Sequence, residues 1–379
     1  MAEKQILIIC GEASGDLNAA NLVKSIKTIA PEIKFASVGG EMLRQQGCRM
    51  ICDIKEFSVI GLFDVLKKLP RFFALKKTIL QEIKSTGFAA VIFVDFSGFN
   101  LRMAKAINRS IPAIYYISPQ VWASRKGRVK TIKKYIDKML VLFRFEKEFY
   151  DNYGIKVEFV GHPLLDIVKP TMEKTAFLSS LGFSADKKII SLLPGSRCSE
   201  VERILPIMLK ACKLIENELG KIQVVIAKST QVSWDLYKNI SSGSGLNLKT
   251  VEGKTYDCMN AASFCLVASG TATLETAIMQ EPFAVIYKMN LLNYLLYRPQ
   301  VKVPFISLVN ILSGKMIVPE FIQFNARPKK ISAKVVNLLK NPKEMDIIKK
   351  NLQRVNESLG EKGASLKAAR QIVDLLKNK

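Results

Sequence analysis

The chain has 379 residues, of which 49% are apolar, and its formal net charge is +24 at pH 7. This length and composition are typical of a globular protein with two domains of ordinary size, and they exclude a disordered chain. The positive charge predicts an anionic partner, and by itself it leaves open nucleic acid, an anionic membrane surface and phosphorylated substrates.

Metal ligands and targeting segments are both missing from the sequence pattern. The 7 cysteines form no Cys-x-x-Cys pair and His162 is the only histidine, so no zinc-binding spacing occurs. We therefore expect no metal site and a reducing, cytoplasmic compartment. No apolar run approaches the roughly 18 residues of a membrane span, and residues 6–10 are too few for the apolar core of a signal peptide. A soluble or peripheral protein is expected.

The first half of the chain alternates short apolar runs with helical periodicity, which predicts a parallel sheet covered by helices. The first run ends in Gly11-Glu12-Ala13-Ser14-Gly15-Asp16, a turn that leads into a helix over 17–29. Neither GxGxxG nor GxxxxGK[ST] occurs, so dinucleotide binding and P-loop phosphate binding are disfavoured. Strands are expected at 6–10, 34–38, 89–95, 113–117, 139–143 and 157–160.

The segment 57–83 is amphipathic, with apolar residues at helical spacing and lysines or arginines on the intervening face. Pro70 predicts a break into two helices. Such a segment is typical of a helix that lies in a membrane interface, although a core stripe with a solvated basic face gives the same pattern. The residues expected in membrane contact are Leu66, Lys67, Lys68, Leu69, Arg71, Phe72 and Phe73.

Asp95 stands at the end of the strand expected at 89–95. In open α/β sheets an acid at this place lies in the ligand crevice, which makes Asp95 a candidate general base, with capping of the next helix as the alternative. A basic run follows at 126–138. No signature of a nucleic-acid module accompanies it, so we expect no nucleic-acid partner.

The second half begins after a linker at 169–171, and its first strand, 189–193, ends in Pro194-Gly195-Ser196-Arg197 ahead of a helix over 200–219. Such a turn presents backbone N–H groups and a guanidinium to an anion. A similar turn at 268–275 carries Glu275, a carboxylate that could accept both hydroxyls of a ribose. The other expected elements are strands at 222–227, 264–267 and 283–286, a strand or turn at 248–251, and helices at 255–261, 273–279 and from 364.

Motifs spread over nearly the whole length resemble those of the lipid-A-disaccharide synthase family, and in the same order. The matching stretches are GEASGD (11–16), VDFSGFN (94–100), YISPQVWA (116–123), FEKEFYDNYGI (145–155), VGHPLLD (160–166), LLPGSR (192–197), ASGTATLE (268–275) and VPFISLVNILSGKMIVPEFIQ (303–323).

The resemblance implies an α/β fold of the GT-B type, with two Rossmann-like, doubly wound parallel-sheet domains that face a cleft. Residues 1–168 would form the acceptor and lipid side, residues 169–363 the UDP-sugar side, and residues 364–379 a helix that packs back on the first domain.

The implied reaction is that of an inverting glycosyltransferase in lipid A biosynthesis. UDP-2,3-diacylglucosamine would donate its sugar to 2,3-diacylglucosamine 1-phosphate, giving the β-1,6-linked disaccharide 1-phosphate and UDP. No cofactor and no metal would be needed. The protein would be peripheral on the anionic, cytoplasmic face of the inner membrane, and the family resemblance also allows a homodimer.

The resemblance assigns roles to individual residues. Asp95 matches the candidate base, and Arg197 would hold the leaving diphosphate. Ser196, Gly270 and Thr271 would meet phosphates, and Glu275 would hold the ribose. The full set of expected substrate-binding residues is Glu12, Ser14, Gly15, Asp16, Ser196, Gly270, Thr271, Thr273, Glu275, Asn310 and Gln323.

The sequence departs from the family pattern at a few positions. Gly98 stands where many members have a second acid, so Asp95 would act alone or with Glu12. Asn18 replaces a common histidine and Arg144 a common proline. His162 is an alternative base, or a residue that only shapes its Gly-His-Pro turn.

Three other readings stay open. One is another GT-B enzyme of UDP-sugars, an epimerase or a lipid-linked N-acetylglucosamine transferase, against which GEASGD and ISPQVWA argue. The second is a homologue weakened in catalysis, suggested by Gly98 in place of the second acid. The third and most remote is a basic nucleic-acid-binding protein.

Overall fold

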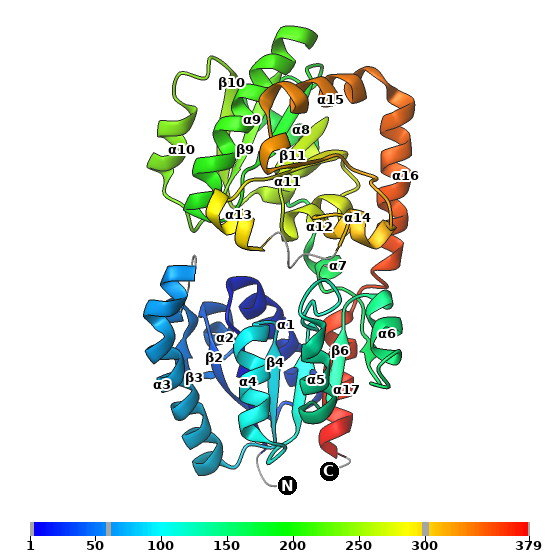
Figure 1. The fold of residues 1–379 in the computed structure, drawn as a ribbon. Coiled ribbons are helices and arrows are strands. Elements are labelled where there is room, and N and C mark those ends of the chain that lie inside the picture. Colours follow the sequence, from blue (N-terminus) through cyan, green and yellow to red (C-terminus); the bar gives the residue numbers. More distant parts are fainter. Residues whose placement is uncertain (1–3, 58–61, 298–302, 378–379) are drawn as a thin grey trace. The chain divides into compact units, whose positions relative to one another are not determined.

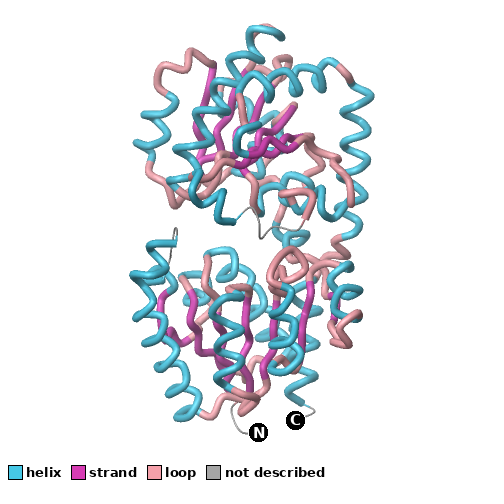
Figure 2. The backbone as a smooth tube through the Cα atoms, viewed as in Figure 1, coloured by secondary structure: helices cyan, strands magenta, loops and turns pink. Residues whose placement is uncertain are grey.

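The structure is a computed structural model that describes residues 4–57, 62–297 and 303–377. The chain forms two compact α/β units (Figures 1 and 2). Unit 1 comprises Met1–Asp166 and Leu359–Lys379, and unit 2 comprises Ile167–Ser358. The chain thus enters unit 2 slightly before the expected boundary at 168, and it returns to unit 1 before the terminal helix begins.

Unit 1 is built on a parallel sheet with the strand order β3-β2-β1-β4-β5-β6-β7. The order reverses between β1 and β4, and ligands of such sheets bind at the carboxyl ends of the strands beside this reversal. The strands are β1 (Gln5–Ile9), β2 (Lys34–Gly39), β3 (Arg49–Asp53), β4 (Ala90–Val94), β5 (Ala113–Tyr116), β6 (Lys138–Val141) and β7 (Glu158–Phe159).

Helices cover this sheet and bury its apolar strands. The helices α3, α4 and α5 contribute side chains to one core with β1, β4 and β5. The C-terminal helix α17 packs along α1 within the same unit (Figure 1). The helices of unit 1 are α1 (Ala13–Ile29), α2 (Glu41–Gln45), α3 (Leu62–Thr86), α4 (Ser97–Ile107), α5 (Val129–Tyr135), α6 (Arg144–Asp151) and α17 (Ala364–Lys377), and α7 (Leu164–Ile167) lies at the boundary of the units.

The helix α3 continues through Pro70, so the expectation of two helices was wrong. A proline removes one main-chain donor and kinks a helix. After it, however, Leu75, Ile79 and Ile83 are buried against the sheet at helical spacing. We attribute the continuous helix to this packing, which outweighs the cost of one lost hydrogen bond.

Unit 2 repeats the topology of unit 1, with the parallel strand order β10-β9-β8-β11-β12-β13. Its reversal lies between β8 and β11, the strands that precede the two glycine turns. The strands are β8 (Ile189–Leu193), β9 (Gln223–Lys228), β10 (Asn247–Glu252), β11 (Phe264–Ala268), β12 (Phe283–Tyr287) and β13 (Glu320–Ile322).

The helices of unit 2 surround its sheet, and α9 carries the longest apolar stripe of this unit into the core. The helices are α8 (Lys174–Leu181), α9 (Cys198–Leu219), α10 (Trp234–Ser241), α11 (Thr255–Ala261), α12 (Thr271–Ile278), α13 (Leu291–Tyr297), α14 (Leu308–Ser313), α15 (Pro328–Lys340) and α16 (Pro342–Ser358).

Across the part of the chain that the structure describes, no helix is long and apolar enough to cross a membrane.

The close approach of two loops at the reversal of unit 1 requires a glycine. A Cβ atom added to Gly11, after β1, would lie 2.2 Å from Cγ of Phe96, after β4. No side chain fits there unless the aromatic ring moves. Gly98, two residues after Phe96, has open space around the corresponding position.

We therefore expect Gly11→Ala to lower the free energy of unfolding by roughly 1–3 kcal/mol, the usual cost of overpacking. Gly98→Ala is the matched control, because it adds the same methyl group in the first turn of α4, where alanine favours the helix. Denaturant unfolding followed by circular dichroism measures both. Equal stability of the two variants would contradict the packing argument.

Candidate functional site

Asp95 lies at the carboxyl edge of the unit 1 sheet, directly after β4 and next to the reversal of strand order. Its backbone has φ of 49°, and Phe96 follows with φ of 45°. Two successive residues with side chains in the left-handed region are unusual and cost free energy, so the surroundings must hold them.

Two buried side chains hold this backbone by binding the carbonyl oxygen of Asp95. Nδ2 of Asn100 donates to it at 2.9 Å and the hydroxyl of Tyr115 donates at 2.5 Å. Nδ2 of Asn100 also lies within hydrogen-bonding distance of the carbonyls of Ile9 and Val94, so it ties β1 to β4. Neither residue was expected to have a role, although Tyr115 lies in the strand expected at 113–117 and Asn100 closes the VDFSGFN motif, in the first turn of α4.

The carboxyl group of Asp95 has its pKa raised to about 6. The main cause is burial, and the negative charge of Glu12 adds to it, while the backbone N–H of Phe96 favours the charged form. A carboxylate with this pKa is largely ionised at neutral pH and still basic enough to accept a proton, as a general base must.

The N-terminus of α1 places its four expected substrate-binding residues in different surroundings. Glu12 and Ser14 are exposed, and Glu12 occupies the N-cap position. Gly15 is buried, and a Cβ atom there would lie 3.3 Å from Cβ of Cys10. Of these four residues, only Glu12 and Ser14 therefore present side chains to solvent.

Asp16 differs from its expected role in substrate binding. It is 4% exposed, and its carboxylate accepts hydrogen bonds from the backbone N–H groups of Gly40 at 2.7 Å and Met42 at 2.9 Å. Its charge therefore caps the start of α2. In this structure Asp16 organises the Gly39-Gly40 turn, and its carboxylate binds backbone N–H groups.

In unit 2, the turn after β8 holds a carboxylate at the position expected for an anion. Oε2 of Glu200 accepts from the backbone N–H of Ser196 at 3.0 Å, and Oε1 lies 3.5 Å from Nη1 of Arg197. Gly195 has φ of 115° and sits so close to Glu200 that a Cβ atom would clash with it. The turn thus already binds a negative group, which is what a phosphate would require of it.

The second glycine turn of unit 2 starts α12. Gly270 is the N-cap with φ of 153°, and Thr271 is exposed. The hydroxyl of Thr273 is committed to the carbonyl of Gly270 at 2.8 Å, so Thr273 stabilises the turn. Gly270 and Thr271 remain placed to present backbone N–H groups at a helix N-terminus.

Glu275 lines a pocket of about 240 Å³ within unit 2, together with residues of the β10–α11 loop. Oε1 of Glu275 accepts a hydrogen bond from the hydroxyl of Tyr256 at 3.2 Å, and burial raises the pKa of this carboxyl group. The pocket is lined by Thr171, Gly253, Lys254, Thr255, Tyr256, Asp257 and Glu275. Its size and mixed polarity suit part of a nucleoside.

Asn310 and Gln323 do not offer polar atoms to a ligand in this structure. Asn310 is fully buried; its Nδ2 donates to the carbonyl of Val318, and its Oδ1 accepts from the N–H groups of Ile317 and Val318. Gln323 binds both the N–H and the carbonyl of Met289. Each residue therefore positions a loop, a role that the motif match alone could not separate from substrate contact.

His162 is buried in unit 1, and burial lowers its pKa to about 3. Its Nδ1 accepts from the N–H of Leu164 at 3.2 Å, and its own backbone N–H donates to the carbonyl of Leu359. With this pKa and these hydrogen bonds, His162 shapes the turn where the chain leaves and re-enters unit 1. This favours a structural role for His162 over a role as the catalytic base.

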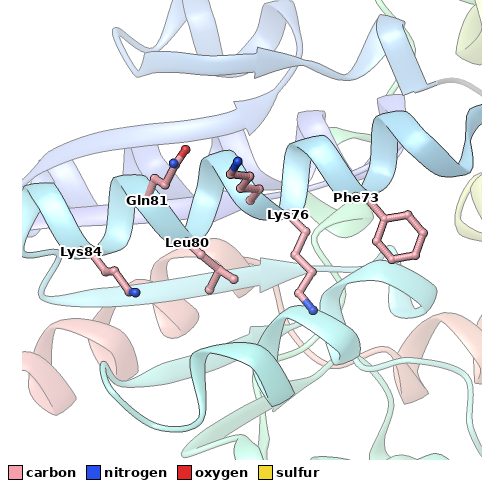
Figure 3. A pocket seen from close by; sticks show the side chains of 6 residues that line it. Phe73, Lys76, Leu80, Gln81 and Lys84 are labelled. Atoms are coloured by element: carbon pink, nitrogen blue, oxygen red, sulfur yellow. The ribbon is translucent and has the colours of Figure 1, made fainter.

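The amphipathic segment 57–83 falls mainly on α3, where Phe73 is 67% exposed. Figure 3 shows Phe73, Lys76, Leu80 and Lys84 on one side of the helix, where they line a shallow pocket. Arg71 is exposed as well. The side chains of Leu66, Lys67, Lys68 and Leu69 lie outside the described part of the structure.

Phe72 departs from the expected membrane contact. Its ring is half-buried, with its centroid 6.2 Å from that of Phe96 and 6.0 Å from that of Phe99. It therefore belongs to the core beneath α3, since a residue adjacent to Phe73 on a helix points about 100° away from it.

No group of three or more His, Cys, Asp or Glu side chains in the described residues is arranged to hold a metal ion.

Comparison with known proteins places the chain in one family. The family model of lipid-A-disaccharide synthetase matches residues 6–373. A lipid-A-disaccharide synthase of Syntrophus aciditrophicus is 38% identical over 380 residues, covering 100% of this chain and 99% of the relative. The enzyme of the same name from Myxococcus xanthus is 36% identical, covering 98% and 97%.

Solved structures resemble the fold at much lower identity. The S. aureus MnaA–UDP co-structure has a TM-score of 0.66 at 14% identity and covers 99% of this chain and 97% of that one. The calicheamicin glycosyltransferase CalG4 has a TM-score of 0.61 at 14% identity and covers 100% and 99%. The two units therefore have the GT-B fold, and the chain belongs to the lipid-A-disaccharide synthetase family.

Proposed function

We propose that this protein is the glycosyltransferase that joins UDP-2,3-diacylglucosamine to 2,3-diacylglucosamine 1-phosphate, with formation of the β-1,6-linked disaccharide 1-phosphate and UDP. Family membership over nearly the full length supports the reaction. The single structural observation that carries it is Asp95, a half-buried carboxylate with a raised pKa at the strand reversal of unit 1. The other UDP-sugar enzymes considered are not favoured, because the full-length relatives share this one name.

In the proposed mechanism, the carboxylate of Asp95 accepts the proton of the acceptor 6-hydroxyl while that oxygen attacks the anomeric carbon. The bond from this carbon to the diphosphate breaks, and UDP leaves with the electron pair, so the configuration inverts. Arg197 and the N–H of Ser196 stabilise the negative charge that grows on the diphosphate. Glu200, which now occupies that turn, would give way to the phosphate.

The nucleoside end of the donor would occupy the pocket beside Glu275. Its carboxylate would accept hydrogen bonds from the ribose, and the N–H groups at Gly270 and Thr271 would meet phosphate oxygens. All the charge stabilisation in this scheme comes from protein groups, and we propose that no cofactor takes part.

The activity is tested by incubating the purified protein with both lipid substrates in detergent and measuring UDP and disaccharide. We expect both products in equal amounts, dependent on both substrates. Release of no more UDP than from heat-killed protein would refute the proposed function.

Removal of the base should abolish most of the turnover. We expect Asp95→Asn to lower kcat by roughly 100-fold to 10,000-fold, the range typical of general bases. Asp374→Asn is the matched control, since it removes an exposed carboxylate from α17 of the same unit. In the unaltered protein kcat/KM should fall tenfold per pH unit below about 6, because protonation of Asp95 removes the base. Near-normal turnover by Asp95→Asn would exclude this role.

We further propose that α3 binds the anionic cytoplasmic face of the inner membrane, where both lipid substrates reside. Phe73 would enter the interface while Arg71, Lys77 and Lys84 meet lipid headgroups. Among the described side chains of α3, the one acidic group, Glu82, is paired with Arg49 at 2.6 Å.

Vesicle sedimentation tests this membrane contact. We expect binding to anionic vesicles that weakens with added salt, and we expect Phe73→Ser to weaken it several-fold. The matched control is Ile347→Ser, which removes an apolar side chain of similar exposure, 58%, from α16. If both variants bind as the unaltered protein does, α3 is not the contact.

A further inference from the structure

The helix α13 of unit 2 carries an apolar stripe that faces solvent. Leu291, Leu292 and Leu295 are 50%, 57% and 60% exposed, and Phe324, after β13, is 61% exposed. Residues at i, i+1 and i+4 share one side of a helix, and in a globular protein such a stripe normally turns to the core. On the neighbouring side of the helix, the ring of Tyr294 packs edge-on against that of Phe324, with 6.1 Å between the ring centroids.

The loop that leads into α13 is fixed at the edge of the sheet that also carries the phosphate-binding turn. Tyr287 lies at the end of β12, and burial is the main reason that its pKa is raised. The negative charge of Glu200 raises this pKa further and the positive charge of Arg197 lowers it, so both residues lie near Tyr287. Two residues on, the backbone of Met289 is bound on both sides by Gln323. Asn290 then starts the helix through its Oδ1, which accepts from the N–H of Leu292 at 2.9 Å.

The exposed leucines therefore follow a loop that begins at Tyr287, beside the proposed diphosphate site. Figure 1 shows α13 at the same edge of unit 2 as α12, whose N-terminus carries the other glycine turn. The described part of α13 bears no charge, and Lys288 flanks it, so it would not repel an anionic amphiphile.

We propose that Leu291, Leu292, Leu295 and Phe324 form an acyl-chain surface that binds the fatty acyl groups of the nucleotide-sugar donor. A sugar held by its diphosphate at Arg197 would extend its acyl chains along this surface, where they remove apolar area from water. The inference rests on the proposed function, and it adds the feature that distinguishes an acylated UDP-sugar from a plain one.

Affinity for the donor, measured by calorimetry below its aggregation concentration and without acceptor, tests this surface. We expect the Leu292→Ser/Leu295→Ser double variant to bind UDP as tightly as the unaltered protein does. Its Kd for UDP-2,3-diacylglucosamine should rise by roughly tenfold, as expected for the loss of two apolar contacts. Ile347→Ser, an equally exposed apolar position elsewhere on unit 2, should change neither value.

Three results would overturn the proposal. Unchanged donor affinity means that the stripe touches no acyl chain, and equal weakening of UDP binding means that the variant disturbs the nucleotide loops. Loss of vesicle binding with intact donor affinity would assign the stripe to the membrane. Because no acceptor is present, these binding results are independent of turnover. If the enzyme is active but binds UDP and the acylated donor with equal affinity, the acyl-chain surface alone is refuted. If the chain makes no disaccharide, the proposed function alone is refuted.

Discussion

The geometry of unit 1 depends on the hydrogen bonds that Asn100 and Tyr115 donate to the carbonyl oxygen of Asp95. They hold Asp95 and Phe96 in the left-handed region, a conformation that costs of order 1–3 kcal/mol per residue when nothing supports it. The bend turns the chain sharply from β4 into α4 and brings the Phe96 ring against Gly11. As a result, the carboxylate of Asp95 lies close enough to Glu12 and deep enough in the edge for its pKa to rise.

In each unit the candidate functional residues lie at the reversal of strand order. The two reversals carry different kinds of chemical group. In unit 1 the turns after β1 and β4 bring together the carboxylates Glu12 and Asp95, which favours proton transfer. In unit 2 the turns after β8 and β11 offer backbone N–H groups and Arg197, which favours anion binding. The same topology therefore serves proton transfer in unit 1 and anion binding in unit 2. The difference lies in the few residues that follow β1 and β4 in unit 1 and β8 and β11 in unit 2.

The sequence predicted the strands around both reversals well, since buried parallel strands are continuous apolar runs, and β8 has the expected bounds. It did not predict β3 or β13, which are short edge strands of mixed polarity. Asp95 and Arg197 could be singled out because their turns carry a chemical signature. The internal roles of Asp16 and Asn310 could not, because a side chain that binds backbone and one that binds substrate can share the same motif. Likewise, Phe72 packs in the core and Phe73 faces solvent because of the rotation of α3 about its axis. The pattern of apolar residues does not fix this rotation to within one residue.

The central claim, that the fold holds Asp95 as a poised base, is tested most directly by measuring its carboxyl pKa. Carboxyl ¹³C resonances of the protein labelled at aspartate can be followed over pH, with Asp95→Asn identifying the signal. We expect a midpoint near 6, and a lower midpoint in Glu12→Gln, where the neighbouring negative charge is gone. A midpoint near 4, the ordinary value for an exposed aspartate, would contradict it.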